Sequence, residues 1–114
     1  PDTPATSGLL NRLVFSAMKP ASVLFNVGRG NVLDETALVD AVCNGKIAGA
    51  VLDVFKTEPL PIDHPFWTTK GILITAHTAA LSILVDIAPI FMENFKRFQK
   101  GVPLKYCVDF NQGY

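Results

Sequence analysis

Three short apolar runs divide this chain of 114 residues into predicted strands and the segments between them. The runs cover residues 22–27 (SVLFNV), 48–55 (AGAVLDVF) and 71–76 (GILITA). Each is continuous, short and rich in branched or aromatic side chains, as is typical of strands buried on both faces of a parallel sheet. The pattern therefore predicts three buried strands.

A helix is predicted between the first two strands, over residues 35–44. Asp34 stands where a capping residue is favoured, Glu35 adds negative charge to the first turn, and Gly45 follows the end. The residues expected on its buried side are Leu38, Ala41 and Val42.

Two more helices are predicted, one at each end of the chain. Residues 7–18 form the first, which ends before Pro20, and its apolar side is expected to hold Leu9, Leu10, Leu13 and Val14. Residues 79–99 form the second, with Pro89 as the place for a kink and an extended tail after Gly101.

A strand, a helix and a strand at this spacing form a βαβ unit, so the strands are expected to be parallel and the class α/β. Three strands with this much apolar surface leave a sheet edge and some helix faces uncovered. We therefore interpret residues 1–114 as part of a larger, doubly wound sheet. The first residue, Pro1, is not methionine, so the natural start is expected upstream.

Net charge, hydropathy and cysteine content limit the partners and the compartment that we expect for this protein. The formal net charge is zero, which does not favour nucleic acid or an anionic membrane. The most apolar window, residues 81–91, is shorter than the ~20 residues of a membrane span. Cys43 and Cys107 form no metal or redox motif and fit a reducing cytoplasm.

Polar residues follow each predicted strand: Arg29 after the first, Asp53 and Glu58 at the second, and His77 after the third. The carboxyl ends of parallel strands share one rim, where ligands bind. An arginine there can hold a carboxylate with two hydrogen bonds, and a histidine beside a carboxylate can exchange protons near neutral pH.

Taken singly, these residues have other readings. For Arg29, a surface position in a glycine-rich turn is as good a reading as a functional one. Glu58 alone is favoured as a solvated loop residue, and His77 alone is favoured as a structural histidine. Asp53 lies in an apolar run and needs a partner there. His64 is expected at a helix start, and Phe66 and Trp67 are expected to pack.

The ordered segments PDTPAT, FNVGRGNVLDETAL, GKIAGAVLDVFKTEPLP, HPFW and ITAHTAALS together resemble the D-isomer-specific 2-hydroxyacid dehydrogenases. The closing KGVPLKYCVDFNQGY is similar to the end of the glyoxylate/hydroxypyruvate reductase-like branch. The resemblance implies a Rossmann-type NAD-binding fold and hydride transfer between NAD or NADP and a small 2-keto or 2-hydroxy acid.

Roles follow by position from this resemblance. Arg29 would bind the substrate carboxylate and polarise the keto group, His77 would be the acid and base, and Glu58 would orient His77. The resemblance implies no metal ion. It implies that the protein is a homodimer. The expected cofactor-binding residues are Pro1, Thr6, Val27, Gly28, Arg29, Asp53, His77, Ala79 and Ala80.

The chain departs from the family in two respects. Ala76 replaces the proline that usually precedes the histidine, and the G-x-G-x-x-G fingerprint and the substrate domain are missing. Residues 1–114 are therefore interpreted as the C-terminal half of the NAD(P)-binding domain, inactive alone. A corepressor-like binding protein and a truncated remnant of the same fold stay open as alternatives, whereas a formate dehydrogenase is less favoured.

Overall fold

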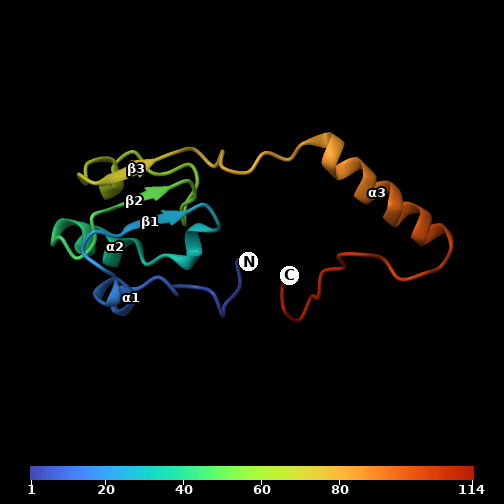
Figure 1. The fold of residues 1–114 in the computed structure, drawn as a ribbon, viewed down its shortest axis with the longest axis horizontal. Coiled ribbons are helices and arrows are strands. Elements are labelled where there is room, and N and C mark those ends of the chain that lie inside the picture. The colour runs from blue at the N-terminus through green and yellow to red at the C-terminus, as the bar shows by residue number, and fades with distance from the viewer. The chain divides into compact units, whose positions relative to one another are not determined.

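The computed structural model describes residues 1–114, which form two compact units, Pro1–Ala79 and Ala80–Tyr114. The first unit contains a sheet with helices, and the second contains the long C-terminal helix (Figure 1). Every residue that we predicted to act in catalysis lies in the first unit.

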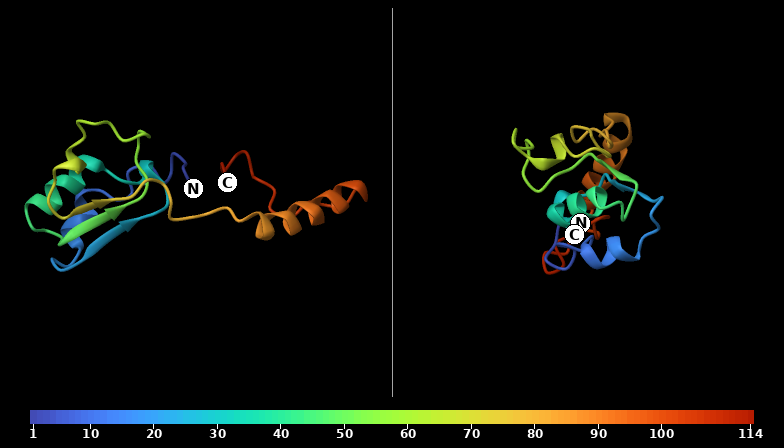
Figure 2. Two further views of the ribbon diagram at one scale, coloured as in Figure 1. Left: turned by 90° about the horizontal axis from the view of Figure 1, so that it is seen from above. Right: turned by 90° about the vertical axis from the view of Figure 1, so that its left-hand side faces the viewer.

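The sheet consists of β1 (Val23–Asn26), β2 (Gly49–Leu52) and β3 (Ile72–Ile74). The order is β1-β2-β3 and both pairs are parallel, with the arrows side by side in Figures 1 and 2. Helix α2 (Glu35–Cys43) connects β1 to β2. The predicted βαβ unit and the α/β class are therefore confirmed.

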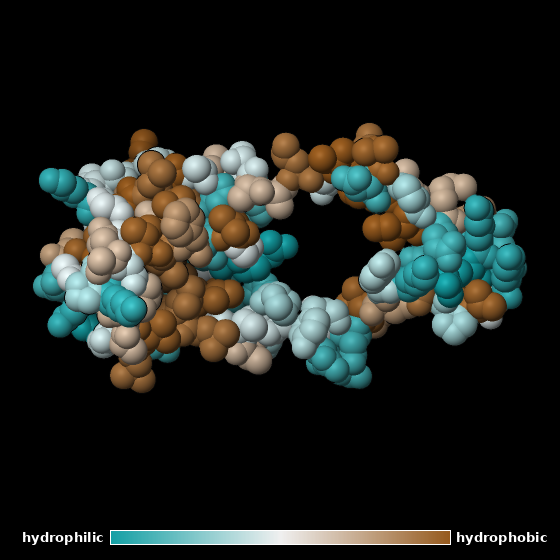
Figure 3. Space-filling view, viewed as in Figure 1, coloured by the Kyte–Doolittle hydropathy of each residue, from teal (hydrophilic) through white to brown (hydrophobic).

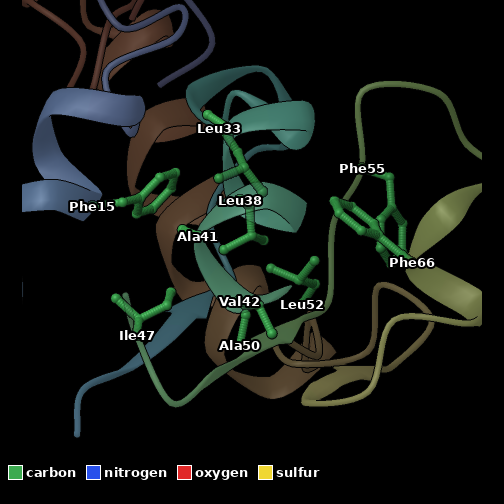
Figure 4. Close-up of a cluster of buried hydrophobic side chains, with 11 residues drawn as sticks. Phe15, Leu33, Leu38, Ala41, Val42, Ile47, Ala50, Leu52, Phe55 and Phe66 are labelled. Atoms are coloured by element: carbon green, nitrogen blue, oxygen red, sulfur yellow. The ribbon is translucent and has the colours of Figure 1, made fainter. Parts of the chain in front are cut away.

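Helix α2 begins and ends where the sequence predicts. The Asp34 carboxylate accepts a hydrogen bond from the Ala37 N–H at 3.0 Å, and Gly45 adopts a left-handed φ of 66° after the end. The helix packs on one face of the sheet. The side chains of this core are Phe15, Leu33, Ala37, Leu38, Ala41, Val42, Ile47, Ala50, Leu52, Phe55 and Phe66, of which all but Ala37 are labelled in Figure 4.

The first helix differs from its prediction. Helix α1 covers Arg12–Ala17 and not residues 7–18, because Gly8 is left-handed, Leu10 pairs with Leu33 in a parallel bridge, and Asn11 caps the helix. The expected apolar side is wrong as well. Leu13 is 81% exposed, and Phe15 is the residue that α1 buries.

The other face of the sheet is open. Phe25, Val51 and Leu73 lie in one row across the three strands, and Phe25 and Leu73 are 66% and 61% exposed. Figure 3 shows apolar surface over these strands. The prediction that the strands are buried on both faces is therefore wrong for β1 and β3, because this face has no layer packed on it.

Two 3₁₀ turns, η1 (Gly30–Val32) and η2 (Pro65–Trp67), complete the first unit. His64 caps η2, as expected of a residue at a helix start. Phe66 is buried as predicted. Trp67 is not, because its indole N–H donates to the Pro61 carbonyl at 2.7 Å at the surface.

The second unit contains helix α3 (Leu84–Gln99), which continues through Pro89. It begins five residues after the predicted start at residue 79; Thr78 and Ala79 donate their N–H groups to the Asp53 carboxylate in the first unit. Its apolar residues are exposed, and the expected extended tail forms no strand. Neither α3 nor any other helix has the length and apolar content needed to cross a bilayer.

Candidate active site

The carboxyl ends of β1, β2 and β3 meet at one rim of the sheet, as parallel pairing requires. Arg29 follows β1, Glu58 lies in the loop after β2 and His77 follows β3. All three line one cleft of about 240 Å³. The structure thus brings together three residues that the sequence separates by 48 positions (77 − 29).

His77 and Glu58 form a direct pair in this cleft. The His77 Nδ1 lies 2.8 Å from the Glu58 Oε2, and the other carboxylate oxygen accepts a hydrogen bond from the Phe55 N–H at 2.9 Å. These donors lower the pKa of Glu58, with His77 as the largest cause. An ionised carboxylate only accepts, so Nδ1 donates, and Nε2 is left to exchange a proton with a ligand.

The backbone at His77 is unusual. Its φ is 53°, a left-handed conformation that histidine adopts more readily than most residues but at a cost in energy. Asp53 holds this turn: its carbonyl accepts from the His77 N–H at 2.8 Å, and its carboxylate accepts from the N–H groups of Thr78 and Ala79, both at 2.9 Å. The direction of the imidazole thus depends on Asp53.

Asp53 is only 2% exposed, yet it stays ionised. The Thr75 hydroxyl and the backbone donors of Thr78 and Ala79 lower its pKa from 3.8 to about 2. The sequence argument that a carboxylate in an apolar run needs partners is confirmed. Its expected contact with a cofactor stays a prediction, and the structure shows that it also secures the His77 turn.

Replacing Asp53 with asparagine is expected to weaken folding and to change its pH dependence. A lowered pKa means that this carboxylate stabilises the fold above pH 3.8 and that the contribution is lost as the pH falls toward about 2. The variant should therefore unfold at a lower urea concentration than the parent at pH 7. Its free energy of unfolding should also lack the part of the decline at low pH that comes from protonation of Asp53.

Urea midpoints of the complete protein, measured at pH 7 and at steps between about 4 and 2, check this expectation. Asp63→Asn, which changes an exposed carboxylate, is the control and should leave both measurements unchanged. An Asp53→Asn profile parallel to that of the parent would contradict the expectation.

Asn26 holds the turn that carries Arg29, a role that the sequence analysis missed. It is 6% exposed; its amide oxygen accepts from the Gly28 N–H at 3.2 Å, and its amide nitrogen donates to the Arg29 carbonyl at 3.1 Å. The Arg29 side chain is exposed, with Nη1 donating to the Gly28 carbonyl at 2.8 Å. The signal was available, because Asn26 is a polar residue inside an apolar run.

Gly30 was also missed. It is buried, and a Cβ at this position would collide with the backbone of Phe55 and Lys56. Glycine therefore lets the turn after β1 touch the loop after β2. This contact joins the backbone segments that carry Arg29 and Glu58.

The residues expected to bind a cofactor lie in several places. Val27 and Gly28 are exposed at the carboxyl end of β1, and the Pro1 carbonyl accepts from the Thr6 hydroxyl at 2.7 Å in the exposed N-terminal loop. Ala79 is exposed after the His77 turn, and Ala80 is the first residue of the second unit. Their contacts with a cofactor stay predictions.

A second, larger cleft of about 660 Å³ also includes His77 and Glu58 in its lining. The rest of its lining is mainly apolar and consists of Phe55, Pro59, Leu60, Trp67, Ile74, Thr75 and Ala76. His77 thus lines two clefts. It shares the smaller one with Arg29, and the larger one is mainly apolar.

The parallel α/β sheet and the rim that holds Arg29, Glu58 and His77 agree with the class that the sequence resemblance implies, a nucleotide-binding domain of a dehydrogenase. Residues 1–79 match the model of the D-isomer specific 2-hydroxyacid dehydrogenase family, NAD binding domain, and the chain belongs to this family. The predicted family resemblance is confirmed.

The similar proteins are reductases and dehydrogenases of the same family. The chain is 46% identical over its whole length to glyoxylate/hydroxypyruvate reductase A of Photorhabdus laumondii and 39% identical to that of Serratia proteamaculans. It covers 36% of each of these proteins, so it spans little more than a third of the length of the curated relatives.

Solved structures match the whole chain, and two of them come from Xanthobacter autotrophicus and Sinorhizobium meliloti. One is a D-isomer specific 2-hydroxyacid dehydrogenase from Xanthobacter autotrophicus in complex with NADPH and MES, with a TM-score of 0.93, 41% identity and 47% of that chain covered. The other is an NADPH-dependent glyoxylate/hydroxypyruvate reductase from Sinorhizobium meliloti in complex with NADP and sulfate, with a TM-score of 0.91, 34% identity and 38% covered. The predicted Rossmann-type fold is confirmed.

Proposed function

We propose that the protein containing this chain reduces a small 2-keto acid of the glyoxylate or hydroxypyruvate type to the 2-hydroxy acid, with NAD(P)H as the reductant. The observation that carries the proposal is the placement of Arg29 on one cleft with the hydrogen-bonded pair of His77 and Glu58. The relatives named above support the substrate class and the cofactor.

Each residue of the cleft has a role in this proposal. The Arg29 guanidinium binds the substrate carboxylate and stabilises the negative charge that develops on the keto oxygen. The His77 imidazolium gives its Nε2 proton to that oxygen and becomes a neutral imidazole. Glu58 stabilises the imidazolium before this transfer and fixes the ring through Nδ1. In the reverse direction, Nε2 takes the proton from the hydroxyl.

The residues at the rim fit a nicotinamide cofactor, which when bound supplies the hydride for the keto carbon. The backbone of Val27 and Gly28 is exposed at the carboxyl end of β1, and a Cβ added to Gly28 would approach only the Asn26 amide oxygen, at 3.7 Å. A ligand therefore finds open backbone there, while Ala79 offers a small, exposed side chain.

We also propose that residues 1–114 are the C-terminal half of the NAD(P)-binding domain. The open row of Phe25, Val51 and Leu73 supports this, because an uncovered apolar sheet face calls for another layer of structure. Residues 1–114 alone are then expected to be inactive.

A cytoplasmic homodimer completes the proposal. Cys43 and Cys107 are exposed and free, as suits a reducing compartment. Sedimentation analysis of the complete protein tests the dimer.

The test of function is oxidation of NADH and NADPH by the complete protein with glyoxylate, hydroxypyruvate and pyruvate, followed at 340 nm beside residues 1–114 alone. Turnover by the complete protein and none by the shorter chain is expected. No turnover by a complete protein that binds NADPH would overturn the proposal and favour the corepressor-like alternative.

A further inference from the structure

A second pair of a histidine and a glutamate lies outside the cleft. The His64 Nε2 is 3.5 Å from the Glu35 Oε2, and both side chains are 18% exposed. The other ring nitrogen of His64, Nδ1, accepts a hydrogen bond from the Phe66 N–H at 3.3 Å. Because Nδ1 is the acceptor, the ring proton is on Nε2 and faces Glu35.

Glu35 connects this pair to the loop that carries Glu58. Its Oε1 accepts a hydrogen bond from the Lys56 N–H at 3.1 Å. The preceding N–H, that of Phe55, is bound by Glu58 at 2.9 Å. Two glutamates from different segments thus hold two consecutive backbone N–H groups of one loop.

The same backbone is constrained by packing. Gly30 contacts the Phe55–Lys56 peptide so closely that no side chain fits between them. The His64 ring packs edge-on against the Phe66 ring, with the ring centroids 4.4 Å apart. The centroids of the Phe66 and Phe55 rings are 6.3 Å apart. Displacement of this peptide would therefore move both Glu58 and the turn that carries Arg29.

We propose that Glu35 and His64 are positioning residues, which fix the Phe55–Lys56 peptide and through it the Glu58 carboxylate against His77. This inference rests on the proposed function of Glu58 and His77. Stabilisation of α2 alone does not account for the arrangement, because Asp34 already caps that helix and the Glu35 carboxylate accepts from the Lys56 N–H of the loop.

Three variants of the complete protein separate positioning from general stability. Glu35→Ala removes the acceptor for the Lys56 N–H, whereas Glu35→Gln keeps a neutral acceptor. His64→Asn keeps a side chain that caps well but loses the Nε2–H that faces Glu35. Asp34→Ala is the matched control, because it removes a cap at the same helix end without touching the loop.

Glu35→Ala and His64→Asn are expected to lower kcat about 10-fold or more, because small displacements of catalytic groups are costly, with the Kd for NADPH unchanged. Glu35→Gln has one acceptor oxygen for the Lys56 N–H and none for the His64 Nε2–H, so it should recover only part of the rate. Asp34→Ala should lower the melting temperature and leave kcat unchanged. Equal kcat losses in Asp34→Ala and Glu35→Ala would overturn the proposal.

A double-mutant cycle supplies the second test. If Glu35 acts through Glu58, the Glu35→Ala change should have little further effect on kcat in a Glu58→Gln protein. The same fold-loss in both backgrounds would show that Glu35 acts by another route and would overturn the proposal.

The His77 ring gives a readout that does not need activity. Its Nδ1 proton, bound to Glu58, is observed by nitrogen-15 NMR of histidine-labelled protein, with His77→Asn for assignment. The resonance should move or broaden in Glu35→Ala and His64→Asn but not in Asp34→Ala. An unmoved resonance overturns the positioning role. A moved resonance in a protein without reductase activity supports that role and rejects the proposed function.

Discussion

Replacing His77 with asparagine is expected to lower kcat for 2-keto acid reduction by the complete protein roughly 10²- to 10⁴-fold, the usual contribution of a positioned acid or base. Asparagine is chosen over alanine because residue 77 is left-handed, with φ of 53°, and asparagine tolerates that conformation. The variant thus removes proton transfer without adding backbone strain.

Two further measurements show that the loss is chemical. The melting temperature of His77→Asn should stay close to that of the parent, since the contacts of Asp53 with this turn use backbone N–H groups. The Kd for NADPH, measured separately, gives the part of the loss that comes from cofactor contacts of residue 77. A kcat within tenfold of the parent, with binding and stability intact, would mean that another group supplies the proton.

The fold was predictable where the signals were local. The cap at Asp34, the glycine at position 45 and the short apolar runs each act within a few residues, and α2 and the parallel strands follow from them. The prediction of α1 was wrong because a long-range bridge between Leu10 and Leu33 overrides the local helical pattern.

The candidate site was predictable to a similar extent. Parallel topology alone places Arg29, Glu58 and His77 at one rim, and the structure finds them on one cleft. The supporting residues could not be predicted in this way. The contact of Gly30 with Phe55 and the bond from Lys56 to Glu35 join segments whose distance apart depends on the packed fold.

Asn26 and Asp53 show how far the functional site can be predicted from polar residues in apolar runs. Each is a buried polar residue in an apolar strand segment, and the sequence argument was applied only to Asp53. The structure gives both the same kind of task, since each holds the turn that follows a strand. A polar residue at a buried strand end thus indicates a supported turn, whether or not it touches a ligand.

Replacing Arg29 with alanine is expected to lower kcat/KM for the keto acid about 10²- to 10³-fold, as loss of one donor to a developing oxyanion does. The loss should appear in both KM and kcat, because the same guanidinium is proposed to bind the carboxylate and to stabilise the keto oxygen. Arg29→Lys should recover only part of it, since an ammonium group cannot form the paired hydrogen bonds of a guanidinium.

Arg12→Ala is the matched control, because it removes an arginine that is paired with Asp40 at 2.7 Å and lies outside the cleft. Its kinetics should equal those of the parent. Buried Asn26 holds the turn at residue 29 through backbone groups, so Arg29→Ala should keep the parent's melting temperature. If Arg29→Lys restored full activity, position 29 would need only a positive charge. The proposal that the guanidinium forms paired hydrogen bonds with the keto acid would then be wrong.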